Sequence, residues 1–183
     1  MSRYTRFLTT FFAFAVMGLF GAQAALAADK HVIDQDAEAA LNSLYSTSPG
    51  AKALGDKASG VLVFPSVTKA GFIVGAQGGS GSLFEKGKVT GHYETGALSV
   101  GLQAGVQSYG YALFFMTAED LKYLKTSSGW SLGVGPTIVV ADAGAAKDAS
   151  TLTGKPGVYA FIFDQKGLMA GMGLVGQKIT KIK

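Results

Sequence analysis

The stretch that decides the fold is residues 58–81, ASGVLVFPSVTKAGFIVGAQGGSG. It begins with an apolar run, Val61 to Phe64, which is typical of a buried strand. Pro65 then interrupts the run, and we expect a turn there because proline has no N–H for a central strand to use. A single cation, Lys69, follows between two apolar runs, and the segment ends in glycines. We interpret the glycines as positions where a sheet bends or another backbone comes close.

The region from residue 60 to residue 116 is β-like throughout. Strands are predicted in GVLVFP (60–65), AGFIVGAQG (70–78), SLFEKGKVTGHYETG (82–96) and ALSVGLQAGVQSYGYALFFM (97–116). EKGK contains a hairpin turn, and residues 99–107 alternate between small or polar and apolar side chains, as on the two faces of a strand. Further strands are predicted within 129–144, 157–164 and 167–179, with DQKG (164–167) as a tight turn between the last two.

Three helices are predicted around these strands. Residues 30–45 repeat apolar side chains at helical spacing. A short helix follows, with Ser48 as its N-cap and Gly60 at its end, and TAEDLKYLK (117–125) starts with a capping box. The predicted fold class is therefore α+β: a mainly antiparallel, strongly curved or barrel-like sheet with two N-terminal helices and one further helix. The 26 glycines, most of them in apparent strands, favour the curved sheet.

Residues 1–27 have the pattern of a secretory signal peptide. Arg3 and Arg6 precede an apolar stretch, and Ala25-Leu26-Ala27 provides the small residues of a cleavage site. The apolar stretch is shorter than the roughly 18–20 residues that a spanning helix needs. We therefore expect residues 28–183 to be a single exported domain, located in the periplasm and free or peripherally attached to a membrane.

Composition and charge exclude several classes of protein. The chain has no cysteine, which rules out disulfides, a thiol nucleophile and thiolate metal ligands. Removal of Arg3 and Arg6 with the signal leaves 14 basic residues against 12 acidic ones, a formal charge of only +2. The remaining lysines are scattered and no arginine is left, so the basic stripe of a nucleic-acid-binding protein is missing.

The motifs that would carry catalysis lack the context they need. GWSLG (129–133) matches a nucleophile elbow around Ser131, but a strand-like segment follows it, and His31 and His92 both precede it. GMGLVG (171–176) matches a dinucleotide motif but lies too near the end of the sequence to open a helix. The two histidines have no zinc-ligand spacing. We therefore predict no enzyme activity, no catalytic, cofactor-binding or metal-binding residue, and no cofactor.

Residues 49–81, PGAKALGDKASGVLVFPSVTKAGFIVGAQGGSG, resemble the SYLF lipid-binding domain family of yeast actin-patch proteins, their animal relatives and many exported bacterial proteins. LSVGLQAGVQ (98–107), the Gly135-Pro136 pair and VYAFIFDQKGLMAGMGLVGQKI (158–179) extend the resemblance over about residues 33–180. The resemblance implies a compact domain that binds membrane lipids. Actin is not expected as a partner of an exported bacterial chain.

We therefore predict an exported, non-enzymatic protein whose partner is membrane lipid, with anionic phospholipid among the candidates and no nucleic acid. The helix at 30–45 has an acidic polar face, which anionic lipid would repel. The lysine-bearing stretches are better candidates, with Lys69 and Phe72 at the rim of a sheet. The predicted lipid contacts are Lys52, Lys57, Lys69, Phe72, Lys86 and Lys88.

Two other functions remain as alternatives at this stage. The first is a small outer-membrane β-barrel protein. This alternative is supported by the signal peptide, the glycine-rich and aromatic strands and the alternation at 99–107. The N-terminal helices and the helix at 117–125 speak against it. The second alternative, ranked last, is a serine hydrolase that uses Ser131.

Overall fold

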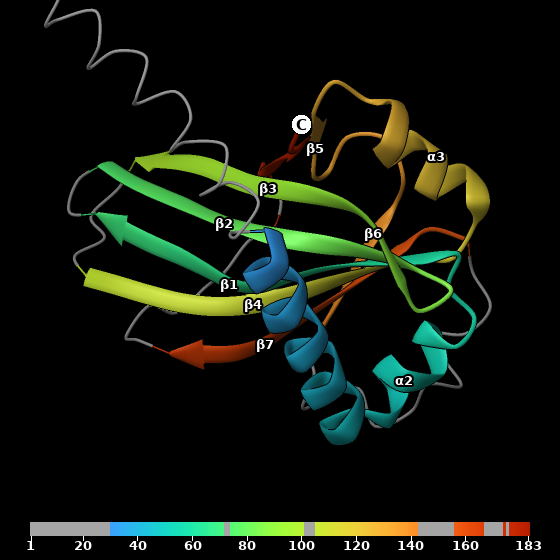
Figure 1. The fold of residues 1–183 in the computed structure, drawn as a ribbon. Helices are drawn as coiled ribbons and strands as arrows, with labels where there is room; N and C mark the ends of the chain where they lie inside the picture. Colours follow the sequence, from blue (N-terminus) through green and yellow to red (C-terminus); the bar gives the residue numbers. More distant parts are fainter. Residues whose placement is uncertain (1–29, 72–73, 101–104, 143–155, 167–173, 175) are drawn as a thin grey trace, which may run out of the picture. The chain divides into compact units, whose positions relative to one another are not determined.

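An eight-stranded sheet fills most of the described part of Ile33–Lys183, the larger of the two units into which the chain divides (Figure 1). The computed structural model describes residues 30–71, 74–100, 105–142, 156–166, 174 and 176–183. The sheet is mostly antiparallel and strongly curved, and three helices accompany it, which confirms the predicted α+β class.

The strands range in length from the two residues of β5 to the 13 residues of β3. Their bounds are β1 (Gly60–Gly71), β2 (Val74–Glu85), β3 (Lys88–Val100), β4 (Gly105–Phe115), β5 (Trp130–Ser131), β6 (Ile138–Asp142), β7 (Val158–Lys166) and β8 (Lys178–Lys181). Their order in the sheet is β5-β8-β3-β2-β1-β4-β7-β6. Neighbouring strands are antiparallel except β6 and β7, which are parallel.

The second and third predicted helices begin where the sequence predicts. In the described residues, the N-terminal helix covers residues 30–47. In α2 (Pro49–Gly55), the Ser48 side chain accepts a hydrogen bond from the Ala51 N–H, and in α3 (Ala118–Thr126), Thr117 accepts one from the Asp120 N–H. The predicted end of the second helix at Gly60 is wrong, because α2 ends at Gly55 and Gly60 is the first residue of β1. None of the helices in the described residues is long and apolar enough to cross a membrane.

The sheet carries an apolar core on each face. Leu62 and Phe64 of β1 belong to the core on one face, here called the inner face, and Val61 and Val63 belong to the core on the other, the outer face. Phe64 is fully buried, as its place in the apolar run predicts. The N-terminal helix contributes Ala37, Leu41 and Leu44 to the outer core, and α2 contributes Ala51 and Leu54 (Figure 1).

Pro65 does not end β1, so the turn predicted there is wrong. The register of β1 against both β2 and β4 shifts around this residue, and the strand continues to Gly71. A bulge of this kind is one of the few places where a sheet accepts proline. As a result, the strand predicted at 70–78 is divided between the end of β1 and the start of β2, with residues 72–73 outside the described part.

The tight turn predicted at 164–167 is also wrong for residues 164–166, which continue β7; residue 167 lies outside the described part. Asp164 has a φ of 51°, and the register of β7 against β4 shifts beside it, so the turn-forming residue is used in a bulge. The last two strands are not a hairpin, because β7 lies between β4 and β6 whereas β8 pairs with β3. The turn predicted in EKGK is confirmed by the pairing of Glu85 with Lys88.

Candidate functional site

The ends of four strands, β1 to β4, extend beyond the outer core, and there the outer face of the sheet is exposed. Leu98 of β3, Ala76 of β2, Ala70 of β1 and Val106 of β4 are opposite one another in register and form one row across the sheet. All four are exposed, and Leu98 at 81% and Val106 at 68% are the two most exposed large apolar side chains of the described residues. At about 4.8 Å per strand, the row is roughly 14 Å wide.

A second row lies two residues further from the strand ends on the same face. It contains the small side chains of Thr68 and Ser108 together with Gly78 and Gly96. A lysine stands at each end of this row: Lys178 of β8 pairs with Gly96, and Lys166 of β7 pairs with Ser108. Both lysines are exposed. The rows are about 7 Å apart, since each residue of a strand advances by roughly 3.4 Å.

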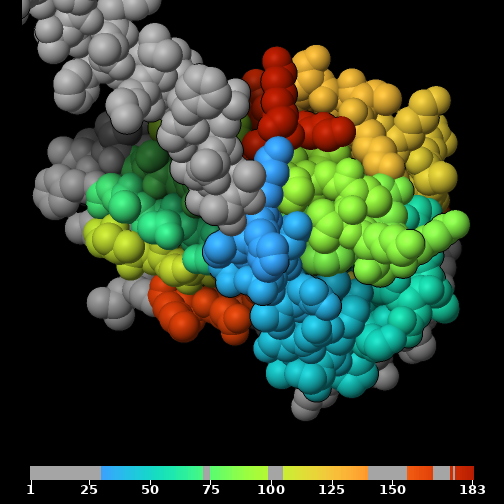
Figure 2. Space-filling model, viewed as in Figure 1, coloured from blue at the N-terminus to red at the C-terminus, as the bar shows by residue number. Residues whose placement is uncertain are grey.

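We call this surface the strand-end face, made of Ala70, Ala76, Leu98, Val106, Lys166 and Lys178. In Figure 2 the ends of β2 and β4, in green and yellow-green at the left, extend past the N-terminal helix. The apolar row lies nearer the strand ends than the two lysine ammonium groups do. The row can therefore enter an apolar phase while the ammonium groups stay in a polar layer. The small residues between the lysines leave no large side chain protruding from this part of the sheet.

The inner face at the same strand ends is polar instead. Lys69 of β1 lies between Gln77 of β2 and Gln107 of β4 in register, and Gln107 is buried. The Tyr109 hydroxyl donates to Gln77 Oε1 at 3.3 Å. Lys69 is half-buried. Among the predicted lipid contacts that the structure describes, it is the one that reaches this end of the sheet, on the face opposite the apolar row.

A chain of buried hydrogen bonds continues from there and holds β8 to the rest of the sheet. Gln177 Nε2 donates to the Tyr109 hydroxyl at 2.9 Å, and Thr95 Oγ1 donates to Gln177 Oε1 at 3.0 Å. The Tyr111 hydroxyl donates to Thr95 Oγ1 at 2.8 Å. Burial raises the pKa of Tyr109 and of Tyr111, so both stay neutral donors at physiological pH. This network fixes the start of β8 and therefore the position of Lys178.

The other predicted lysines lie at the far end of the sheet. Lys52 is paired with Asp56, and its ammonium lies 5.6 Å from the centre of the Tyr45 ring. Lys57 follows α2, and Lys86 and Lys88 flank the β2–β3 turn; all three are exposed. Nine residues of β1 separate this end from Lys69, roughly 30 Å at about 3.3 Å per residue. Lys69 and the other lysines therefore do not form one surface, and Phe72 lies outside the described residues.

Sequence reasoning missed the residues that make up the strand-end face. Val106 falls within the alternation at 99–107, but periodicity does not tell which of the two faces is buried. The structure buries Gln107 and exposes Val106, the reverse of the usual arrangement. The alternation of small or polar residues with apolar ones was the available signal, because polar side chains can satisfy one another in a buried network.

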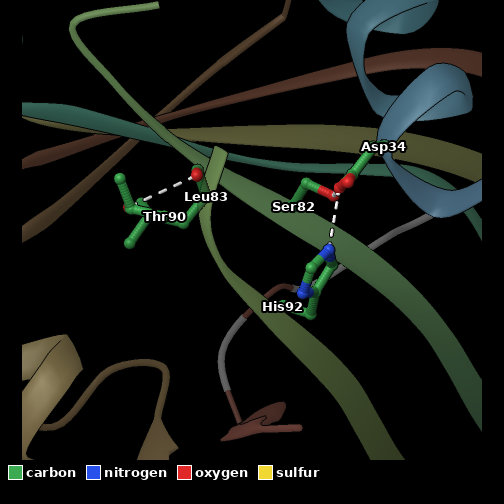
Figure 3. A network of polar contacts seen from close by, with 5 residues as sticks. All are labelled: Asp34, Ser82, Leu83, Thr90 and His92. Atoms are coloured by element: carbon green, nitrogen blue, oxygen red, sulfur yellow. Dashed lines mark hydrogen bonds and ion pairs between the residues drawn. The ribbon is translucent and has the colours of Figure 1, made fainter. Parts of the chain in front are cut away.

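The polar contacts around His92 hold the N-terminal helix to the sheet (Figure 3). The Asp34 carboxylate accepts a hydrogen bond from the Ser82 hydroxyl at 2.6 Å and lies 2.9 Å from His92 Nε2. Asp34 therefore links the N-terminal helix to both β2 and β3, and His92 is used in this structural contact. Ser131 is exposed in the short β5 and is followed by turns, so it lacks the strand–turn–helix context of a nucleophile elbow. In the described residues, no group of three or more metal-ligating side chains is present.

These features define an α+β domain with one exposed apolar surface at its strand ends. A family model described as Ysc84, Las17-binding protein actin regulator, matches residues 96–183. The matched segment is similar to this family, the SYLF domain, and the match confirms the predicted resemblance for residues 96–183. Leu98, Val106, Lys166 and Lys178 of the strand-end face all lie within the matched segment. A search of curated proteins found no match.

Proposed function

We propose that the protein is an exported, non-enzymatic domain that binds membrane lipid through its strand-end face. The observation that carries the proposal is the row of Leu98, Ala76, Ala70 and Val106, which is apolar and exposed beyond the outer core. Contiguous exposed apolar side chains on a folded domain mark a binding surface. The match of residues 96–183 to the SYLF family supports lipid as the partner.

The two lysines give the proposed lipid contact its orientation. Lys166 and Lys178 stand on the outer strands β7 and β8, about 24 Å apart across five strand spacings. With the apolar row inserted, both ammonium groups lie at the level of the lipid phosphates. Lys69 lies on the other face of the same strand ends and supports the same orientation. Such an arrangement favours anionic phospholipid, because each lysine near a negative surface contributes about 1 kcal/mol.

Replacing both Lys166 and Lys178 with glutamine is expected to weaken binding to vesicles that contain phosphatidylglycerol by roughly 30-fold. The estimate takes about 1 kcal/mol for each lysine and about 1.4 kcal/mol for each tenfold change in affinity. Raising the salt concentration should reproduce most of this loss in the parent protein, because exposed charges are screened within a Debye length. Vesicle co-sedimentation at several salt concentrations measures both effects.

The charge-matched control is the replacement of Lys57 and Lys88 with glutamine. Both lysines were predicted as lipid contacts, and both lie at the opposite end of the sheet. The control should bind vesicles almost as the parent does. If it loses affinity and the Lys166 and Lys178 variant does not, the lipid surface is the helix-and-turn end of the domain.

Export is proposed from the basic start, apolar middle and small-residue exit of residues 1–27. The mature chain is then expected to begin near Ala28 and to reside in the periplasm, free or attached at a membrane surface. Intact-mass measurement on protein recovered from the periplasm tests this directly. A mass equal to that of residues 1–183, found in the membrane fraction, would contradict cleavage.

A non-enzymatic role is proposed because the structure does not pair Ser131 with His92, the candidate nucleophile and base. His92 contacts Asp34, which also accepts a hydrogen bond from Ser82, whereas Ser131 lies on β5 beside Lys178 of β8. The description of the matched family names an actin regulator, but an exported chain would not meet actin in the periplasm. We therefore carry over lipid binding alone.

A further inference from the structure

A second candidate site lies at the end of the sheet opposite the strand-end face. There a groove of about 460 Å³ runs between the N-terminal helix, the end of α2 and the β2–β3 turn. Glu38, Asn42 and Tyr45 form its helix wall, since residues spaced by three and four share one side of a helix. Lys86 and Gly87 form the opposite wall. The volume is within the range of small-molecule sites.

The groove combines an apolar floor with a polar rim. The apolar side chains of Leu41, Val61 and Phe84 form its floor, and they belong to the outer core or pack against it. The side chains of Glu38 and Asn42 make no hydrogen bond or ion pair with any other residue that the structure describes. The Lys86 ammonium interacts electrostatically with Glu85, which does not line the groove and is itself paired with Lys125. A ligand with polar groups at one end can therefore satisfy them without breaking existing contacts.

The charges at the rim have both signs. Asp56 also lines the groove, but it is paired with Lys52, whose ammonium lies over the Tyr45 ring. Among the residues that the structure describes, Glu38 has no ion-pair partner, and it is the anion of the helix wall; Lys86 is the cation at the turn. A purely anionic ligand would be opposed by the two carboxylates, and a purely cationic one by the lysine. Groups of opposite charge on one ligand suit both walls.

We propose that this groove binds a single-chain zwitterionic amphiphile that bears a phosphate and an ammonium group. The phosphate lies beside Lys86, the ammonium lies beside Glu38 and Asp56, and the start of the chain covers Leu41, Val61 and Phe84. The proposal is independent of the strand-end face, because the two surfaces lie at opposite ends of β1. The same headgroup chemistry occurs in a lysolipid and in free phosphoethanolamine.

Calorimetric titration of the folded protein with lysophosphatidylethanolamine, kept below its micelle concentration, tests the site. Phosphoethanolamine in a parallel titration shows whether the headgroup alone suffices, and lysophosphatidylglycerol shows whether the ammonium matters. Lysophosphatidylethanolamine should bind most tightly. Lys86→Gln and Glu38→Gln should each weaken its binding by about three- to fivefold, the range of exposed ion pairs. Glu38→Gln should also narrow the preference over lysophosphatidylglycerol.

Two further variants test whether the ligand binds in the groove itself. Asn42→Trp fills the groove from an exposed helix position and should abolish binding while the domain keeps its melting temperature. Lys88→Gln removes a neighbouring charge that does not line the groove and should leave binding unchanged. Equal binding of all three ligands, or undiminished binding to Asn42→Trp, would overturn the proposal. Replacement of Leu98 and Val106 should leave this titration unaffected, so the test stands apart from that of vesicle binding.

Discussion

Replacement of Gly81 by alanine is expected to lower the free energy of unfolding by about 3 kcal/mol or more. A Cβ atom at this position would lie 2.2 Å from the carbonyl oxygen of Val63 and 2.8 Å from the ring of Phe64. The first of these atoms belongs to the backbone of β1, so the strand itself would have to move. Overpacking in a core costs typically about 1–3 kcal/mol, and more where the backbone cannot yield. Urea denaturation of the parent and the variant measures the difference.

Gly78, on the same strand, provides the matched control. A Cβ atom there would meet its nearest neighbour, the carbonyl oxygen of Thr95, at 3.6 Å, an ordinary contact. Gly78→Ala should therefore be neutral or stabilising, since glycine within a strand is less favourable than alanine by roughly 0.5–1 kcal/mol. Similar denaturation midpoints for Gly81→Ala and Gly78→Ala would contradict the close approach of β1 and β2.

These two glycines show how far the sequence could lead. The abundance of glycine in apparent strands predicted a curved sheet, and the structure has one. Which glycine permits a close approach and which merely leaves the surface flat depends on the register of β1 against β2. That register contains a bulge around Pro65, and local sequence does not reveal it. The helices were easier to predict, because the capping residues Ser48 and Thr117 act within a few residues of themselves.

The site was harder to predict than the fold for the same reason. In the sequence, a lysine at a turn looks the same whether it lies alone or beside an apolar row, and this is why Lys86 and Lys88 are predicted as lipid contacts. Lys166 and Lys178 belong to β7 and β8, which are separated in the sheet by four other strands. Their place on the candidate site therefore depends on the sheet topology. Only the pairing of Lys178 with Gly96 and of Lys166 with Ser108 brings them onto the face that carries Leu98.

Replacing both Leu98 and Val106 with serine is expected to have the largest effect on membrane binding. Each side chain is exposed in the free protein, so serine removes no packing from either core. Burial of a leucine or valine side chain in an apolar phase is worth at least about 1.5 kcal/mol, which gives about 3 kcal/mol for the pair. At about 1.4 kcal/mol per tenfold, the affinity for vesicles should fall by roughly 100-fold. The loss should persist at high salt, because apolar burial is not screened.

Val134→Ser is the control for this variant. Val134 is 63% exposed, close to the 68% of Val106, but it lies in the loop between β5 and β6. Its replacement lowers the exposed apolar area of the protein without touching the strand-end face. It should leave both the melting temperature and vesicle binding as they are in the parent.

The measurement that tests the central claim most directly is vesicle flotation of the parent, the Leu98→Ser and Val106→Ser double variant and Val134→Ser, side by side at low and high salt. Lipid binding through the strand-end face predicts that the parent and Val134→Ser float with vesicles that contain phosphatidylglycerol, and that the double variant stays at the bottom at both salt concentrations. A folded double variant that floats as well as the parent would contradict the claim.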